Sequence, residues 1–257
     1  MQTSEPTQGS KRQRLVAGGG IGLSVVGGLA VLLPGPWYQL GWIGLGQAFD
    51  LMNYGKWIGL AGAICGFAAV LAALVGRRRH VVIAGLVALG LGLGAAAWPV
   101  YMQYQADRVP PIHDITTDTD DIPEFEALVA AREEAPNAVE HPGEAFIEQQ
   151  REAYPDVESR RYAASLDDVF AVAEETARLM QWHVEHADLE RGRIEAVATT
   201  PWFGFQDDVI VRLRDDGDEV VVDVRSASRI GRSDLGVNAE RIREYLANLD
   251  GQLGGER

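Results

Sequence analysis

Residues 208–228 read DVIVRLRDDGDEVVVDVRSAS, and this stretch decides the fold of the second half of the chain. Apolar β-branched residues alternate with polar residues on both sides of RDDGDE, which is typical of two half-buried strands, 208–214 and 219–228. Asp216 and Gly217 form a favoured centre for the tight turn between such strands. The stretch therefore predicts an antiparallel β-hairpin.

Two further runs rich in β-branched residues, 183–189 and 193–200, complete a predicted four-stranded antiparallel sheet. The run 165–182 before them repeats apolar residues at the helical spacing of 3.6, and residues 238–249 after them do the same. Helices on one face of an antiparallel sheet make a two-layer α+β domain.

The two predicted helices carry start signals. Ser165 is a favoured N-cap, and Asp168 stands where a capping-box acid belongs. Asn238 is a favoured N-cap for the last helix.

Three uncharged apolar runs precede this domain, at residues 15–33, 57–75 and 81–100. Each can cross a hydrocarbon core of about 30 Å as a helix rising about 1.5 Å per residue. The first run ends in LLPGPW rather than in a small-residue cleavage site, so we expect a retained helix instead of a signal peptide. Because no run contains Asp, Glu, Lys or Arg, the helices are expected to anchor the protein rather than transport ions.

Two GxxxG pairs occur in these runs, Gly18 with Gly22 and Gly90 with Gly94. Small residues at this spacing let helix backbones approach closely. The pairs predict either a contact between copies of the chain or packing among its own helices.

Charge is divided unevenly along the chain. Residues 1–100 carry seven Lys and Arg against two acidic residues, whereas residues 101–257 carry 16 Arg against 35 Asp and Glu. The acidic half argues against nucleic-acid binding. Lys11, Arg12 and Arg14 precede the first run, and arginines fill the turn 77–79 between the second and third.

These basic residues predict an orientation through the positive-inside rule. The N-terminus and the turn 77–79 are expected in the cytoplasm. The aromatic-rich loop 34–56 is expected at the outer surface, and the domain after residue 100 is expected to be periplasmic or extracellular. We therefore expect a multi-pass protein of a bacterial inner membrane.

Four segments follow from these patterns. They are a cytoplasmic N-terminus (1–14), a membrane anchor (15–100), an extended arm (101–160) and an α+β core (161–257). Residues 110–160 of the arm contain six prolines and few long periodic patterns, which indicates an extended segment that wraps the surface.

The arm contains the stretch PPIHDITTDTDD at residues 110–121. Its acidic residues could bind a hard cation, but their spacing fits no EF-hand. Asp and Thr also bond to nearby backbone in loops. A polar latch, a ligand-facing role and a metal site remain as alternatives; we predict neither a metal nor a cofactor. The single cysteine, Cys65, lies in an apolar run and allows no disulfide within the chain.

PPIHDITTDTDDIPEF, AYP, TTPWFGFQDDVIVRLR and VDVRSASRIGRSDLGVNAERI, read in this order, resemble the domain-of-unknown-function family 1499 over residues 108–250. The resemblance implies no activity; it implies that members are often bacterial and that some carry membrane helices before the domain. It singles out as candidate binding residues His113, Asp114, Thr117, Asp118, Asp207, Asp208, Arg225, Ser226, Ser228, Arg229, Asp234 and Asn238.

Arg225 and Arg229 lie on one face of the last predicted strand and can each grip a carboxylate with two hydrogen bonds. The nearby acids are internal, so we expect Arg225 or Arg229 to fasten an acid of the arm to the sheet.

These patterns predict a binding or assembly module rather than an enzyme. Its partners would be membrane lipid through the three helices, and a protein partner or further copies of the chain. The alternative is an envelope hydrolase that uses His113, Asp114 and Asp118.

Overall fold

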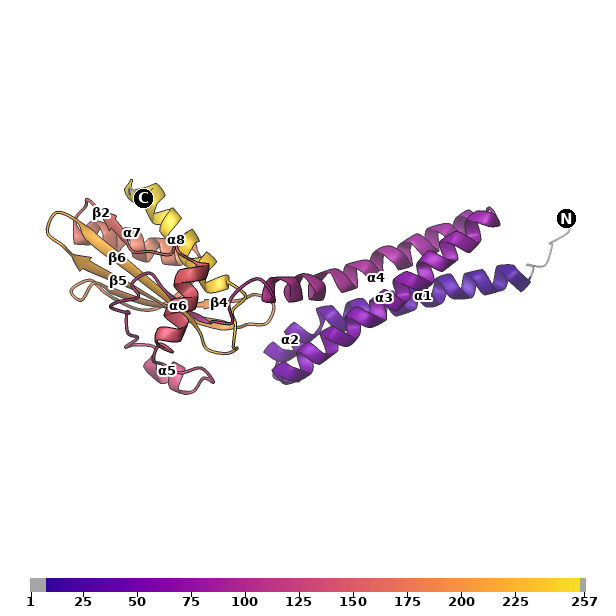
Figure 1. Cartoon of the computed structure of the whole chain (residues 1–257), viewed down its shortest axis with the longest axis horizontal. Helices are drawn as coiled ribbons and strands as arrows, with labels where there is room; N and C mark the ends of the chain where they lie inside the picture. The colour runs from indigo at the N-terminus through magenta and orange to yellow at the C-terminus, as the bar shows by residue number, and fades with distance from the viewer. Residues whose placement is uncertain (1–7, 255–257) are drawn as a thin grey trace. The chain divides into compact units, whose positions relative to one another are not determined.

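The computed structural model describes residues 8–254 and divides the chain into two compact units, residues 1–104 and 105–257 (Figure 1). The first unit is helical. Its helices are α1 (Gln8–Leu32), α2 (Pro34–Gln39), α3 (Leu45–Val75) and α4 (Arg79–Ala106).

Three of the helical segments are long and apolar enough to cross a membrane, which confirms the three predicted apolar helices. Helix α3 begins at Leu45 rather than at residue 57, so part of the predicted outer loop is helical. Helix α4 continues to Ala106, which makes the first residues of the predicted arm helical as well.

Helix α3 buries small residues at alternating spacings of four and three, the repeat of a left-handed coiled coil. They include Gly55, Gly59, Gly62 and Gly66. A Cβ added at Gly66 would lie 2.5 Å from the carbonyl oxygen of Gly85 on α4, so the backbones are in direct contact there. Close approach through small residues is a common way for membrane helices to associate.

The predicted GxxxG pairs have no part in this packing. A Cβ added at Gly18, Gly22, Gly90 or Gly94 would meet nothing within 4 Å among the described residues. Packing within the unit uses other glycines, so the explanation of these pairs by internal packing is wrong.

The second unit contains a six-stranded antiparallel sheet in the order β1-β6-β5-β4-β3, with β2 also paired to β6. The strands are β1 (Asp114–Thr116), β2 (Arg160–Tyr162), β3 (His183–Asp188), β4 (Arg193–Thr199), β5 (Gln206–Asp215) and β6 (Val220–Ser228). The four predicted strands are β3 to β6, and the prediction of only four strands is wrong. Strands of three residues are too short to show the period-two pattern that reveals a strand.

β1 lies in the arm and β2 lies where the arm meets the predicted core, and both pair with the edge of β6 that β5 leaves open. β1 pairs with residues 225–227 and β2 with residues 220–222. On the far side of β1, the side-chain amide of Gln150 accepts a hydrogen bond from the Thr116 N–H at 3.0 Å and donates one to the Thr116 carbonyl at 2.6 Å. Gln150 thereby satisfies backbone groups that would otherwise be open to another strand.

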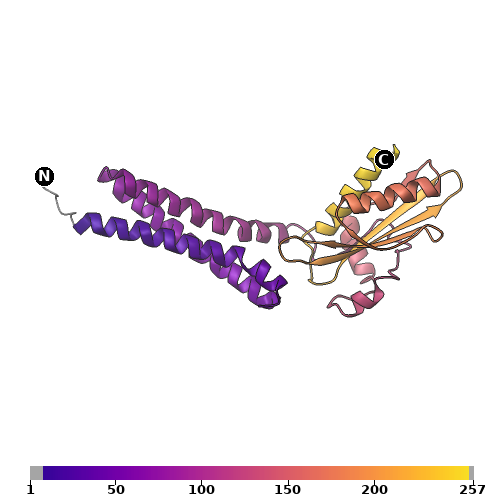
Figure 2. The same cartoon turned by 180° about the vertical axis from the view of Figure 1, so that it is seen from behind.

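Helices α7 (Leu166–Leu179) and α8 (Val237–Leu253) lie together on one face of the sheet (Figures 1 and 2). The Ser165 cap is confirmed, since its hydroxyl oxygen accepts from the Asp168 N–H at 3.2 Å. The Asn238 cap is wrong. Helix α8 begins at Val237 after the left-handed Gly236, and the buried Asn238 side chain turns into the protein.

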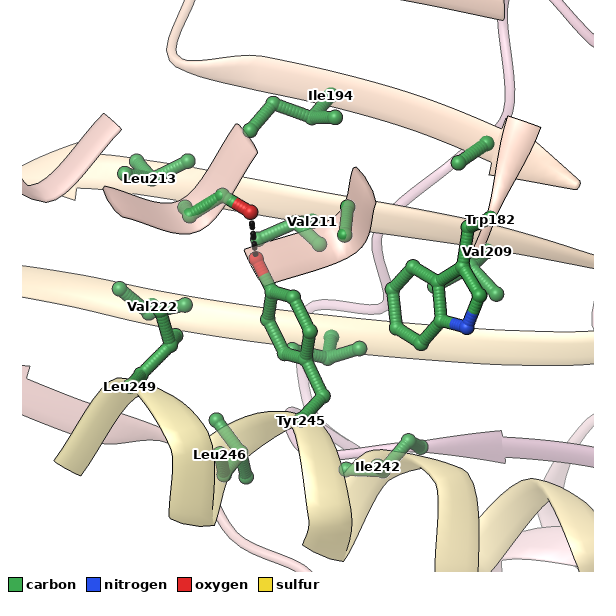
Figure 3. Close-up of a cluster of buried hydrophobic side chains, with 14 of the residues drawn as sticks. Trp182, Ile194, Val209, Val211, Leu213, Val222, Ile242, Tyr245, Leu246 and Leu249 are labelled. Carbon is green, nitrogen blue, oxygen red and sulfur yellow. Dashed lines mark hydrogen bonds between the residues drawn. The ribbon is translucent and has the colours of Figure 1, made fainter. Parts of the chain in front are cut away.

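The main core lies between these helices and the sheet (Figure 3). The Tyr245 hydroxyl donates to the carbonyl of Ala173 on α7 at 2.9 Å, and the Tyr245 ring stacks on Trp182 with 4.9 Å between centroids. Burial raises the pKa of Tyr245 well above its ordinary value. Val209 and Val211 of β5 face this core, so β5 turns its alternate residues to the opposite face.

The arm provides two short helices besides its strands, α5 (Val129–Glu133) and α6 (Glu144–Ala153). Phe125 and Leu128 of the arm pack with Ile210 and Ala227 on the face of the sheet opposite the main core. The arm thus covers the second face.

Candidate functional site

The face of the sheet under the arm carries buried charges. Asp208 of β5 and Asp223 and Arg225 of β6 are at most 2% exposed. Buried charges are costly unless they are paired, so the contacts of these side chains show what the predicted site residues do.

Arg225 fastens the arm through its whole guanidinium group. Its Nε and Nη2 donate to the two carboxylate oxygens of Asp114 at 2.9 and 2.8 Å, and its Nη1 donates to the Pro123 carbonyl at 3.0 Å. The group also lies over the ring of Phe125, 4.7 Å from its centroid. The expected pairing of Arg225 with an acid of the arm is therefore present, and we call the pair Arg225–Asp114 the latch.

Asp208 forms ion pairs with two arginines, Arg132 and Arg229. Arg132, on helix α5 of the arm, donates to Asp208 at 2.9 Å, and Arg229 holds the same carboxylate with distances of 2.7 and 3.0 Å. Arg229 thus pairs with an acid of the sheet. It acts on the arm only through Asp208, which both arginines share.

Asp118 and Asp223 form a third group with two arginines of β5. Arg212 and Arg214 each donate to both carboxylates at 3.0 to 3.2 Å. Asp118 also accepts from the N–H groups of Asp120 and Asp121, the turn that an Asp side chain commonly makes with its own backbone. This group ties the outer end of the stretch 110–121 to the sheet.

Thr117 continues the pairing with β6 in the gap between β1 and β2. Its N–H donates to the Val224 carbonyl at 2.9 Å, and its hydroxyl oxygen accepts from the Val224 N–H at 2.8 Å. The buried threonine therefore satisfies β6 in the gap between the two short strands.

The remaining predicted residues lie beside α8, on the face of the main core. Asn238 accepts from the Ser226 hydroxyl at 2.7 Å and donates to the Ser228 hydroxyl oxygen and to the His113 carbonyl, both at 3.0 Å. Arg241 of α8 donates to Asp207 at 2.6 Å. These contacts fix the end of β6, the start of α8 and the beginning of the arm to one another.

Asp234 stands at the start of α8 and accepts from the N–H groups of Gly236 and Asn238, both at 2.8 Å. These N–H groups precede or open the helix, so Asp234 performs the capping that we predicted for Asn238. Burial raises the pKa of the Asp234 carboxyl above its ordinary value, against the opposing effect of the two N–H donors.

Two histidines flank Phe146 of α6. The ring of His113 lies 5.2 Å and that of His141 lies 6.3 Å from the Phe146 ring. His141 Nδ1 accepts from the Gly143 N–H at 3.1 Å. Within residues 8–254, the buried atoms His113 Nδ1 and His141 Nε2 have no hydrogen-bond partner. Burial lowers the pKa of His141, which keeps the imidazole neutral.

The described residues contain no group of three or more His, Cys, Asp or Glu side chains placed to hold a metal ion. Asp118 lines a groove whose wall includes neither His113 nor Asp114.

That groove is open and encloses about 500 Å³ between the arm, the end of β5 and the start of β6. Arg151, Arg161 and Arg214 lie in its wall with side chains 44 to 55% exposed. The wall also contains carboxylates and hydroxyl groups. Its residues are Thr117, Asp118, Thr119, Asp120, Gln150, Arg151, Tyr154, Pro155, Val157, Glu158, Ser159, Arg161, Arg214 and Val221.

Sequence reasoning did not find Arg132, Asp223, Gln150 or Arg241, which complete the networks. Asp223 carried a usable signal, because a charge among Val220, Val221, Val222 and Val224 marks a strand with a buried polar face. Gln150 and Arg241 lie on helices whose contacts depend on tertiary structure.

The fold is that of a two-layer α+β domain covered by a latched arm, in a chain with three helices that are long and apolar enough to span a membrane. The chain belongs to the family described as "Protein of unknown function (DUF1499)", whose model matches residues 104–249. This match confirms the resemblance found in the sequence.

No curated protein matches the chain. Among solved structures, the crystal structure of CalU16 from Micromonospora echinospora matches 35% of this chain and 72% of its own chain, with 20% sequence identity and a TM-score of 0.22. At that TM-score the similarity supports no structural or functional argument.

Proposed function

We propose that the chain is a membrane-anchored binding module, and that its groove takes a polar segment of a partner protein. The observation that carries this proposal is the difference in exposure between two sets of charged side chains. Asp114, Asp208 and Arg225 are buried and paired, whereas the arginines of the groove wall remain half exposed.

The ion pairs in the groove wall can be exchanged for contacts with a ligand. Arg151 pairs with Asp120, which is 91% exposed, and Arg161 pairs with Asp216 and Glu219, which are 60% and 46% exposed. Exposed pairs of this kind contribute about 0–1 kcal/mol. A ligand carboxylate or amide can therefore replace an existing partner at little cost.

The composition of the groove favours a polypeptide segment. Three arginines and three acids, Asp118, Asp120 and Glu158, line it together with threonine and serine hydroxyls. The groove is therefore close to neutral in a half-chain with 16 Arg and 35 acidic residues. A segment with both charge signs and backbone amides matches such a wall, while a strongly anionic ligand would be repelled by the surrounding surface.

The hydrolase alternative lacks support from the contacts. Asp114 is held by Arg225, and Asp118 is held by Arg212 and Arg214, so neither carboxylate is placed to orient His113. A hydrogen-bonded base and orienting acid are what that chemistry needs.

The proposal includes an orientation. The basic residues before the first span and in the turn 77–79 favour a cytoplasmic location for that end. The domain then lies on the outer face of a bacterial inner membrane, where its partner would be an envelope protein.

A photo-crosslinking residue in the full-length protein tests this function. At position 120, in the groove wall, we expect a discrete adduct in the host membrane; at position 175, an exposed site on α7, we expect none. Arg151→Gln with Arg161→Gln should abolish the adduct, and Arg178→Gln, a comparably exposed arginine on α7, should retain it. Equal adducts from positions 120 and 175, or no adduct from position 120, would refute the groove as the binding surface.

A further inference from the structure

One end of the helical unit carries a dense group of cations. Lys11, Arg12 and Arg14 lie at the start of α1, and Arg77, Arg78 and Arg79 form the turn between α3 and α4. All except Arg78, which is half-buried, are exposed. We call these six residues the cationic end.

The structure brings the two segments of the cationic end together. Arg78 Nη1 donates to the side-chain oxygen of Gln13 at 2.9 Å, and Gln13 donates to the Ala72 carbonyl at 3.0 Å. Arg14 Nε donates to His80 Nε2 at 3.2 Å. These contacts hold the start of α1 against the turn between α3 and α4.

Within residues 8–104, which the structure describes, no carboxylate side chain lies near the cationic end. Asp50 is the only carboxylate side chain among residues 8–104. It lies close to the start of α3, about 37 Å along the helix from Val75 at about 1.5 Å per residue. An anion that approaches the cationic end therefore meets no competing carboxylate among residues 8–104.

The turn after α3 holds Arg77 in a left-handed backbone conformation. The N–H of Arg78 donates to Ala73 and that of Arg77 to Leu74, the hydrogen bonds of a Schellman motif that ends α3. Arg77 has φ +52°, at the position in this motif that favours glycine. An arginine thus occupies a position where glycine would be less strained, so Arg77→Gly can remove the charge without straining the turn.

Apolar side chains adjoin the cations. Leu15 is 74% exposed and Val75 is 90% exposed. Acyl chains can cover these two residues while a headgroup reaches the guanidinium groups above them. An arginine pair binds phosphate oxygens in bidentate fashion.

We propose that the cationic end binds the phosphate headgroup of an anionic phospholipid, between the start of α1 and the turn joining α3 to α4. The apolar residues favour a lipid over a free phosphate ion, since they can contact acyl chains. The inference goes beyond the proposed function and does not depend on the groove.

Native mass spectrometry of the full-length protein tests it, in detergent micelles that contain phosphatidylglycerol or phosphatidylcholine. We expect phosphatidylglycerol to be retained about tenfold more strongly. Arg77→Gly should weaken retention about fivefold, the effect of about 1 kcal/mol per basic residue near an anionic lipid surface. Its thermal stability should not fall, because glycine suits the left-handed turn.

Lys56→Gln is the matched control, since it removes a cation near the opposite end of α3 and should leave retention unchanged. Equal retention of both lipids, or an equal loss in Arg77→Gly and Lys56→Gln, would overturn the site. Displacement of phosphatidylglycerol by equimolar inorganic phosphate would overturn the choice of a lipid.

Discussion

Arg225 and Asp114 are joined by two nearly equal hydrogen bonds, 2.9 and 2.8 Å long, and their side chains are 2% and 1% exposed. One residue belongs to the last strand of the sheet and the other to the arm, 111 positions earlier. A buried pair of this kind adds little net stability by itself, but loss of one partner leaves an uncompensated charge. The latch therefore fixes where the arm lies.

The first prediction concerns this latch. Asp114→Ala should lower the free energy of unfolding by about 3–5 kcal/mol, because Arg225 would stay buried without its counter-charge. Chemical denaturation of the full-length protein in detergent measures the change, and limited proteolysis should show new cleavage between residues 110 and 142.

A double variant shows whether the lost stability comes from the unpaired charge of Arg225 or from the substitution at position 114 itself. Asp114→Leu with Arg225→Met removes both charges and should recover most of the lost stability. If the double variant is as unstable as Asp114→Ala, the unpaired charge is not the cause.

The second prediction concerns pH. Burial lowers the pKa of His141 below its ordinary value of 6.5, with smaller effects from Asp114, Arg225 and His113. The unfolded state then binds more protons than the folded state in the window below pH 6.5, so stability is lost as the pH falls through it. The raised pKa of Asp234 acts in the opposite sense, because it adds stability as the pH falls.

His141→Asn tests this origin, since it keeps an acceptor for the Gly143 N–H and removes the titrating group. Its thermal midpoint should fall less between pH 7 and pH 5 than that of the unaltered protein. Identical pH profiles would show that His141 does not contribute.

The third prediction concerns the helical unit. Gly62→Ala should destabilise it by about 1–3 kcal/mol. The added Cβ would lie 2.6 Å from the Ser24 nitrogen and 2.8 Å from the Gly20 carbonyl oxygen. Gly18→Ala is the matched control and should be tolerated, because the space around Gly18 is open. Thermal unfolding in detergent compares the two, and equal stabilities would contradict the close packing of α1 on α3.

The fourth prediction concerns orientation. In a Cys65→Ser background, a cysteine at Glu190 should react with a membrane-impermeant maleimide in intact spheroplasts. A cysteine at Arg79 should react only after permeabilisation. The reverse pattern would place the domain in the cytoplasm.

The sequence contains enough information for the long elements. Strands β4 to β6 and helices α7 and α8 repeat apolar residues over many positions, because each buries one face against the same core. Strands β1 and β2 have three residues each and exist because β6 offers an open edge, which no local pattern reports.

The sequence indicated which polar residues take part in ion pairs, but it did not indicate which residue pairs with which. The acids of the arm, together with Arg225 of β6 and Arg229 just after this strand, suggested a latch, and Arg225 with Asp114 forms it. Arg229 instead pairs with Asp208. Alternation along a strand shows which face a side chain takes, but it does not show which segment covers that face.

The groove was not foreseen, since its wall combines residues 117–120, 150–161, Arg214 and Val221. Its shape depends on the path of the arm, and that path depends on the latch. The buried pair Arg225–Asp114 therefore helps to set the shape of the proposed binding surface.

Crosslinking from position 120 in an Arg225→Lys background tests this link most directly. Lysine keeps the positive charge but cannot hold Asp114 with two parallel hydrogen bonds. The adduct should fall to the level of the control at position 175, although the groove wall is the same in both backgrounds, with the crosslinking residue at position 120 as its one change. An undiminished adduct in Arg225→Lys would contradict this link.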